Sequence, residues 1–323
     1  MSAILDRRLD GPMAWVGATL LANDGLVALP PDCLAELAEA AATLGANPLP
    51  TEALRPDDFG LPATRALMAG VAETLESGIG FAILDRLPTA ELDAATATRL
   101  YWLLMSLLAR PVAQTWKGEI VYDIVDDGEK TAAGNGVRSS KTNQRQNFHT
   151  DNAFNLPPDY VSLLCLRPAM QGGESGLVSL ESVHNLLREE HRAALERLYQ
   201  PFWMDRQREH APGDSPVNRK SLFACDGESI RAGFSIRLVH QGYEVVGEAM
   251  DDRTAEAIER LTETVARPGL GKSFDFQPGQ IQVINNRRIG HRRGGYVDWP
   301  EPGRRRHLVR LWMRRAGRPF YQG

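Results

Sequence analysis

Apolar residues recur at intervals of three and four positions along the first 110 residues. This spacing is typical of amphipathic helices. The sets that show it are Leu34, Leu37, Ala38, Ala41 and Leu44, then Leu67, Met68, Val71 and Leu75. A third helix is predicted from about Ala90 to Leu108, because the residue before Pro111 disfavours helical backbone. Residues 1–110 are therefore predicted to be mainly helical, with one short strand at 80–85.

From Glu119 onwards the pattern changes to short runs rich in β-branched and aromatic residues, which are typical of strands. These runs are 119–125, 160–166, 176–180, 221–225, 229–238, 272–276, 279–286 and 307–313. Two predicted helices, at about 181–199 and 252–266, interrupt them. Many short strands with few strand–helix–strand alternations indicate an α+β protein with a mainly β core, a barrel or jelly roll wrapped by helices. We expect one domain over residues 1–323, with the core at 115–315.

Composition narrows the class of protein. Apolar residues make up 43% and charged residues 24% of the chain, and the formal net charge is −4. These values fit a globular protein and lack the basic excess of a nucleic-acid binder. Cys33, Cys165 and Cys225 are odd in number and far apart, which argues against a disulfide framework or a CxxC zinc site. With no convincing signal peptide and no membrane-length apolar run, we expect a cytoplasmic protein away from membranes.

The most informative segment for chemistry is Asn147-Phe148-His149-Thr150-Asp151-Asn152. If it is a strand, the side chains of His149 and Asp151 point to the same face, because alternate residues of a strand share a face. An imidazole and a carboxylate so placed can bind one metal ion. An H-x-D pattern alone is common, so the interpretation needs a further ligand.

That further ligand is found late in the chain. His291 follows the predicted strand 279–286, and fifteen residues later comes another strand-like segment with Arg306 and Arg310 on one face. A buried arginine is costly without an anionic partner, and a dicarboxylate suits a guanidinium because the two pair in bidentate fashion. Two histidines and one carboxylate form the facial triad of non-haem iron(II) oxygenases. Zinc can be bound by the same groups, but the arginine would then be unexplained.

These motifs together resemble the TauD/TfdA family of 2-oxoglutarate-dependent dioxygenases, the clavaminate-synthase-like proteins. The matching features are His149-Thr150-Asp151, the segment 168–175, the late His291, and the pair Arg306 and Arg310. The resemblance extends from about residue 80 to Trp312. It implies a double-stranded β-helix, which is a jelly roll, and an enzyme that uses Fe(II), 2-oxoglutarate and O2 to hydroxylate or desaturate a small molecule, releasing succinate and CO2.

The resemblance also implies roles for individual residues. His149, Asp151 and His291 would bind iron, and Arg306 would pair with the distal carboxylate of 2-oxoglutarate, with Arg305 as its rival. Ser175 stands where the family usually has a threonine that donates a hydroxyl to the co-substrate. Arg310 would contact either 2-oxoglutarate or an anionic group of the primary substrate. The intact aspartate argues against a halogenase, in which the carboxylate is replaced to make room for chloride.

Other interpretations stay open at this stage. The polar segment 129–146 is a candidate lid, and Arg145 and Asn147 near it are candidate substrate-binding residues. The substrate class suggested by the family is an amino acid or related metabolite, and a homo-oligomer is possible. The alternatives are a cupin-like isomerase or hydrolase that does not use 2-oxoglutarate, and a non-catalytic jelly-roll protein that binds a ligand.

Overall fold

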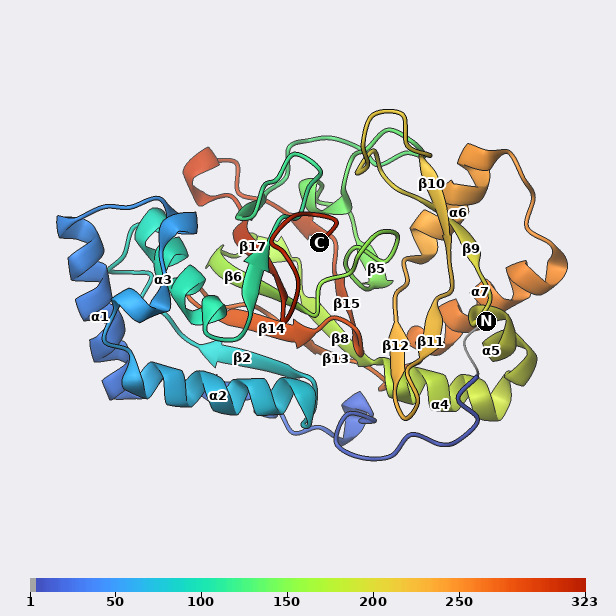
Figure 1. Ribbon diagram of the computed structural model, residues 1–323, viewed down its shortest axis with the longest axis horizontal. Coiled ribbons are helices and arrows are strands. Elements are labelled where there is room, and N and C mark those ends of the chain that lie inside the picture. The colour runs from blue at the N-terminus through green and yellow to red at the C-terminus, as the bar shows by residue number, and fades with distance from the viewer. Residues whose placement is uncertain (1–3) are drawn as a thin grey trace.

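Two β-sheets occupy the middle of the protein in the computed structural model, which describes residues 4–323 (Figure 1). The larger sheet has the strand order β1-β2-β14-β6-β17-β3, with β4 also paired to β17. Neighbouring strands of this sheet are antiparallel, except β1 and β2, which are parallel. Its strands are β1 (Leu26–Ala28), β2 (Phe81–Asp85), β14 (Ile281–Asn285), β6 (Tyr160–Arg167), β17 (His307–Arg314), β3 (Arg110–Val112) and β4 (Tyr122–Ile124).

The smaller sheet has the order β13-β8-β15-β5, and all of its pairs are antiparallel. Its strands are β13 (Lys272–Phe274), β8 (Ser175–Ser179), β15 (Ile289–Arg293) and β5 (Gln146–His149). Apolar side chains of the two sheets pack in one cluster, in which Leu177 and Ile289 of the smaller sheet meet Val161 and Ile284 of the larger. The two sheets thus form the jelly-roll core that the strand pattern predicts.

Three helices cover the larger sheet near the N-terminus (Figure 1): α1 (Pro31–Ala46), α2 (Pro62–Glu76) and α3 (Ala94–Ser106). Leu37, Met68 and Tyr101 from these helices pack with Leu164 and Val309 from the sheet. The three predicted helices are confirmed, as is the strand at 80–85. The third helix is shorter than predicted. It begins after Asp93, whose side chain accepts a hydrogen bond from the Thr96 backbone, and it ends before β3.

A second group of helices packs around the smaller sheet: α4 (Leu180–Glu190), α5 (Arg192–Leu198), α6 (Ile236–Val246) and α7 (Asp252–Val265). With them lie two hairpins, β9 (Phe202–Asp205) with β10 (Val217–Lys220), and β11 (Phe223–Cys225) with β12 (Ile230–Ala232).

Two expectations are wrong here. The helix expected over 181–199 is two helices that meet at His191. The strand expected over 229–238 ends at Ala232, and helix α6 begins four residues later.

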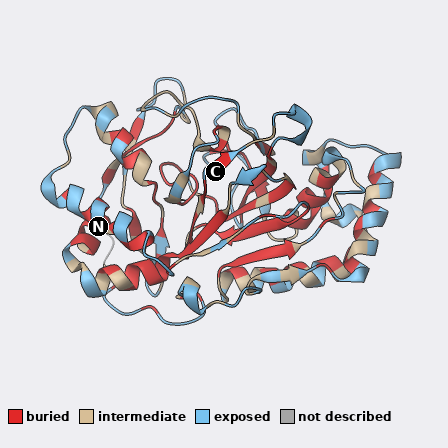
Figure 2. Ribbon diagram, turned by 180° about the vertical axis from the view of Figure 1, so that it is seen from behind, coloured by how far each residue is buried: buried red, intermediate tan, exposed pale blue. Residues whose placement is uncertain are grey.

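Short elements complete the chain. A small pair joins β7 (Gln171–Gly172) to β16 (Tyr296–Val297). The 3-10 turns are Gly17–Thr19, Thr51–Ala53, Pro56–Asp58, Ser139–Lys141 and Pro302–Arg304. The sheet strands are mostly buried, whereas the connecting loops are mostly exposed (Figure 2). Within residues 4–323, no helix combines the length and apolar character that crossing a membrane requires.

Candidate metal centre

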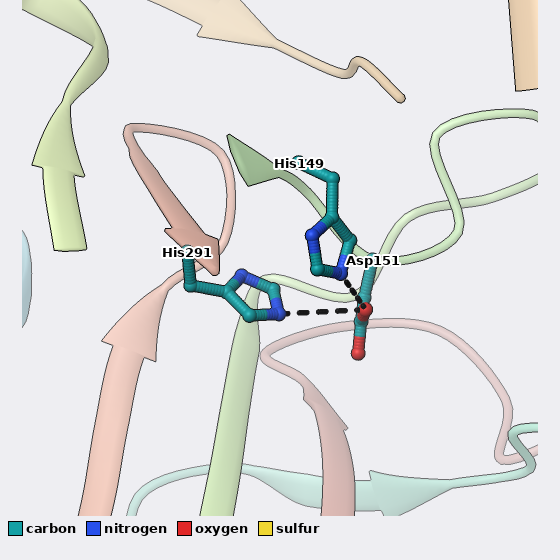
Figure 3. A group of neighbouring side chains, drawn as sticks. All are labelled: His149, Asp151 and His291. Carbon is teal, nitrogen blue, oxygen red and sulfur yellow. Dashed lines mark ion pairs between the residues drawn. The ribbon is translucent and has the colours of Figure 1, made fainter. Parts of the chain in front are cut away.

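Three side chains from the smaller sheet and the turn after it converge in a buried position (Figure 3). His149 is the last residue of β5 and lies directly opposite His291 of β15 in the sheet. Nε2 of His149 lies 3.4 Å from Oδ1 of Asp151, and Nε2 of His291 lies 3.6 Å from the same oxygen. The ligand atoms of the three residues all lie within 4.8 Å of one another. This spacing suits three ligands on one side of a single metal ion.

Asp151 lies in a different element from the one expected. Strand β5 ends at His149, so Asp151 lies in the following turn and not one pleat further along the strand. Asn286, which is fully buried, holds the turn in place: its Oδ1 accepts from the Asp151 backbone at 2.8 Å, and its amide donates to the Asp151 carbonyl at 3.0 Å. The turn is thereby tied to the end of β14.

The protonation states favour metal binding. Nδ1 of His149 lies 2.9 Å from the Asn147 carbonyl, so that nitrogen donates, and the amide of Gln146 donates to Nε2 at 2.9 Å. Nε2 is therefore the unprotonated nitrogen, the one whose electron pair can bind a metal. Burial, followed by the nearby His149, lowers the pKa of His291. Burial opposes ionisation of Asp151, but Arg310 and the two histidines outweigh it and hold its pKa well below the usual value. Neutral imidazoles and a carboxylate are the forms that bind metals.

The second oxygen of Asp151 is already bound. Oδ2 accepts from the Trp312 indole at 2.7 Å and lies 3.1 Å from Nη1 of Arg310. Both residues belong to β17 and lie on one face of it, as the alternation predicted. These contacts orient the carboxylate so that Oδ1 is the oxygen facing the two histidines, as the partners of a ligating carboxylate do in metal sites.

A small cavity lies between the two sheets beside His149 and His291. Its lining includes Ser175, Arg306 and Arg310. Among residues 4–323, Nη1 of Arg306 and Nη2 of Arg310 are buried and lack a hydrogen-bond partner. Such atoms cost free energy unless a ligand or ordered water meets them.

The structure also separates the two rival arginines of this cavity. Arg306 is 5% exposed, whereas Arg305 is exposed and does not line the cavity. Arg306 immediately precedes β17 and does not lie within it. Ser175 begins β8, and its hydroxyl donates to Oε1 of Gln282 at 2.7 Å.

A larger cavity lies on the side of Asp151 and Trp312. Its lining includes Arg145 and Asn147, both exposed, which the sequence suggested as substrate-binding residues. Its wall is formed by residues 138–140, residues 145–152 with Phe154, Gln207, the start of helix α6, and Arg310 and Trp312 of β17. The two cavities share His149, Gln146, Ser140 and Arg310, so the metal ligands lie where they meet.

Several residues of the site were not found from the sequence. Gln114 accepts from Nε of Arg310 at 2.7 Å and donates to the Arg310 carbonyl. Arg293 donates from Nη2 to the carbonyls of Thr142 and Gln144, and so holds the preceding loop against β15. Trp312 had a sequence signal, since it shares a face with Arg310. Gln114 lies far from the ligands in sequence and belongs to no motif, whereas Arg293 follows His291 by two residues on the same strand.

Comparison with known proteins gives one family. The model of the family described as "Taurine catabolism dioxygenase TauD, TfdA family" matches residues 46–312. FR-33289 synthase from Streptomyces rubellomurinus is 30% identical over 328 residues, which cover 99% of this chain and 94% of that protein.

Solved structures show the same fold. Asparagine oxygenase in complex with Fe(II), 2S,3S-3-hydroxyasparagine and succinate has a TM-score of 0.66 at 21% identity, over 90% of this chain and 93% of that one. The non-haem iron oxygenase OrfP in complex with Fe and α-ketoglutaric acid has a TM-score of 0.63 at 17% identity, over 90% and 94%. The expected fold class is therefore confirmed.

Proposed function

This chain belongs to the TauD/TfdA family of dioxygenases, and we propose that His149, Asp151 and His291 bind the Fe(II) with which it oxidises a small molecule. We propose 2-oxoglutarate as the co-substrate, bound in the small cavity beside His149 and His291. Bound together, iron and 2-oxoglutarate would activate O2, which would oxidise both 2-oxoglutarate, to succinate and CO2, and the primary substrate.

The observation that carries this proposal is the pairing of a metal site with unsatisfied guanidinium groups. The triad offers three ligands and leaves the other side of the ion open. In the adjoining cavity, buried NH groups of Arg306 and Arg310 lack partners in the described part of the chain. A dicarboxylate satisfies both groups. A zinc hydrolase or a cupin-like isomerase with the same three ligands has no use for these arginines.

The polar residues of the small cavity would each contact a different part of the bound molecules. Arg306 would pair with the distal carboxylate of 2-oxoglutarate, and the Ser175 hydroxyl would donate to the co-substrate after leaving Gln282. Arg310 has two functions: it orients Asp151 through Oδ2, and its free Nη2 is available to the co-substrate or the primary substrate. Because Asp151 retains its carboxylate, the proposed outcome is hydroxylation or desaturation and not halogenation.

The primary substrate would enter the larger cavity. Asparagine oxygenase and OrfP, which share this fold, are known in complexes with a hydroxylated asparagine and with iron and α-ketoglutaric acid, respectively. These likenesses support an amino acid or related metabolite as the substrate. Arg145 and Asn147, at the rim, are proposed to contact it.

The location of the enzyme, its domain organisation and its oligomeric state are also proposed. We infer a cytoplasmic enzyme because Cys33 and Cys165 are buried thiols outside any disulfide. We infer a single domain over residues 1–323, because the N-terminal helices share an apolar cluster with the jelly-roll core at 115–315. A homo-oligomer is compatible with this arrangement.

The test is a screen for succinate. Purified protein is incubated with Fe(II), 2-oxoglutarate, O2 and a panel of amino acids and related metabolites, and succinate and O2 consumption are measured. We expect at least one compound to raise succinate release well above the uncoupled background, with one O2 consumed per succinate. Protein that binds 2-oxoglutarate but forms no succinate with any addition would support the non-catalytic alternative. Protein that binds iron and ignores 2-oxoglutarate would support the cupin-like one.

A further inference from the structure

The larger cavity is lined by more positive than negative side chains. Four arginines line it, and Asp151 is the one carboxylate among its lining residues. The arginines are Arg138, Arg145, Arg237 and Arg310. A cavity walled by charges of one sign attracts ligands of the opposite sign. An arginine can bind such a ligand most strongly when no carboxylate of the protein already pairs with it.

Two of the four arginines are already neutralised. Arg138 lies 2.6 Å from Oε1 of Glu209, and Arg310 lies 3.1 Å from Oδ2 of Asp151. Arg145 is exposed at the rim, where solvent screens its charge. The remaining one, Arg237, is half-buried in the wall of the cavity.

The contacts of Arg237 are neutral. Its Nη1 donates to Oε1 of Gln241 at 2.6 Å, and its Nη2 donates to Oε1 of Gln207 at 2.9 Å. Among residues 4–323 no carboxylate forms an ion pair with it. Asp205 acts on it only at a distance, because its two oxygens accept from the backbone of Gln207 and Gly134. Burial accordingly lowers the pKa of Arg237. A guanidinium withdrawn from water and given only amide partners is costly unless a ligand supplies the missing charge.

Gln207, one of the two residues that accept from Arg237, has an unusual backbone conformation. Gln207 has φ of 49° and the next residue, Arg208, has φ of 58°, both in the left-handed region that side chains other than glycine rarely adopt. Asp205 stabilises this turn by accepting from the Gln207 backbone at 2.8 Å. Two such residues in succession cost free energy and occur mainly where the strain serves a site. Here the turn places the Gln207 amide against Arg237 in the cavity wall.

The start of helix α6 adds to the positive character of the same wall. Ser235, Ile236, Arg237 and Leu238 all line the cavity, and Ser235 makes no side-chain hydrogen bond to the first turn. Ser235 also forms a β-bridge with His149, so this wall is next to the metal strand. The first N–H groups of a helix favour a nearby anion.

We propose that Arg237, positioned by Gln207 and Gln241, binds an anionic head group of the primary substrate. The head group is a phosphate, phosphonate, sulfonate or carboxylate, and its binding leaves the rest of the molecule directed toward His149 and Asp151. This inference rests on the proposed function, because it assigns the substrate end of that site. It adds a specificity residue on α6 that is distinct from Arg306 and Arg310 on the β17 side.

The experiment uses small anions as probes of this subsite. Protein saturated with Fe(II) and 2-oxoglutarate under anaerobic conditions is titrated by calorimetry with methylphosphonate, methanesulfonate and acetate. The saturating co-substrate keeps the probes away from Arg306. We expect at least one probe to bind saturably, and the strongest identifies the head group. Arg237→Gln should weaken its binding by about tenfold or more, as loss of a charge-assisted hydrogen bond predicts.

Matched variants keep the result interpretable. Arg237→Lys retains the charge and should keep part of the affinity. Arg253→Gln removes an equal charge from an exposed position on α7 and should bind the probe like the wild type. Unchanged binding in Arg237→Gln, or no saturable binding of any probe to the wild type, would overturn the proposal.

The visible band that Fe(II) gives with 2-oxoglutarate is recorded on the same samples. A band without Arg237-dependent probe binding means that this inference fails while the proposed function stands. Probe binding that depends on Arg237, without a band, means that the proposed use of 2-oxoglutarate fails while the anion site at Arg237 stands.

Discussion

The two cavities that meet at His149 are built from different parts of the fold. The smaller cavity takes its polar residues from strands of the two sheets or their immediate ends, including Ser175 of β8 and Arg310 of β17. The larger cavity shares Arg310 but takes most of its polar wall from residues 138–140 and 145–147, a strained turn at Gln207, and the first turn of α6. Strand ladders fix the first site rigidly, whereas loops and helix ends form the second. The proposed co-substrate site therefore rests on hydrogen-bonded strands, whereas the proposed substrate site depends on how loops and a helix end pack.

The largest expected effect comes from the residues where the two cavities meet. Replacing His149, Asp151 or His291 by alanine leaves two ligands and should reduce bound iron and succinate release to background. Metal content after anaerobic Fe(II) loading and gel filtration measures the first, and the succinate assay measures the second. The control is His307→Ala, which removes a histidine that pairs with Asp123 on the protein surface. Full iron occupancy in the Asp151 variant would contradict the assigned ligand set.

The next effect should separate the two cavities. Arg306→Ala removes the charge proposed to hold the distal carboxylate of 2-oxoglutarate, which should weaken its binding by about 2–5 kcal/mol, the range for breaking a desolvated charge pair. Iron binding and the binding of anionic probes in the larger cavity should not change. Arg305→Ala is the matched control, because its side chain is exposed. If Arg305→Ala weakens 2-oxoglutarate binding and Arg306→Ala does not, the assignment of the clamp is wrong by one residue.

A smaller effect is expected at the residue that joins the two regions. Arg293 lines the smaller cavity, yet its guanidinium holds the loop of the larger one through the Thr142 and Gln144 carbonyls. Arg293→Gln should release the loop at a cost of about 1.5–3 kcal/mol, as hydrogen bonds to a charged group predict. Amide hydrogen exchange over residues 139–147 should then become faster. Arg292→Gln is the control, because it breaks a more exposed pair with Glu174 and a hydrogen bond to Ser273 but neither of the bonds to the Thr142 and Gln144 carbonyls. Equal exchange in both variants would show that Arg293 does not anchor the loop.

The hydroxyl of Ser175 should contribute less. Ser175→Ala removes one neutral donor beside the co-substrate, which corresponds to about 1 kcal/mol or roughly fivefold in 2-oxoglutarate affinity. Ser175→Thr, the residue usual in the family, should bind as well as the wild type or better. A titration of 2-oxoglutarate against the three proteins checks both expectations. An alanine variant with unchanged affinity would leave Ser175 as a partner of Gln282 alone.

The smallest effect is expected at the rim of the larger cavity. Arg145 is exposed, so Arg145→Ala should change the affinity of an anionic substrate by less than about 1 kcal/mol. The change should lie mainly in the association rate and should disappear at high salt, as is typical of a charge at the edge of a binding site. Stopped-flow binding at low and high ionic strength provides the measurement. A large loss that persists in high salt would place Arg145 inside the site, next to Arg237.

The same contrast explains what the sequence could predict. Strand β17 has a period-two pattern, so the shared face of Arg310, which lines both cavities, and Trp312, which lines the larger one, was predictable from alternation alone. The three proposed ligands were named from the sequence and lie together in the structure, although Asp151 approaches from a turn and not from the strand, because β5 ends at His149 and Asn286 holds the following turn. Nothing in the sequence near position 151 identifies Asn286 as that support.

The α6 wall of the larger cavity was not predicted from the sequence, because it depends on tertiary packing. Apolar residues occupy every second position from Ile230 through Ala232, Phe234 and Ile236 to Leu238, a pattern that predicts one long strand. The chain instead turns into α6 after Ser235, and Gly242 allows this helix to pack closely against the backbone of Trp203 and Met204. Arg237 was therefore assigned to a strand, and its approach to the metal strand could not be foreseen.

The most direct test of the account is an anaerobic titration of Fe(II) and then 2-oxoglutarate into the metal-free protein, followed by visible absorption. We predict that one equivalent of Fe(II) binds and that 2-oxoglutarate then produces a weak charge-transfer band. Arg306→Ala should shift the band's midpoint to higher 2-oxoglutarate concentration, and Asp151→Ala should abolish it. A wild-type protein that binds iron but shows no band at any 2-oxoglutarate concentration would contradict the assignment of the smaller cavity to the co-substrate.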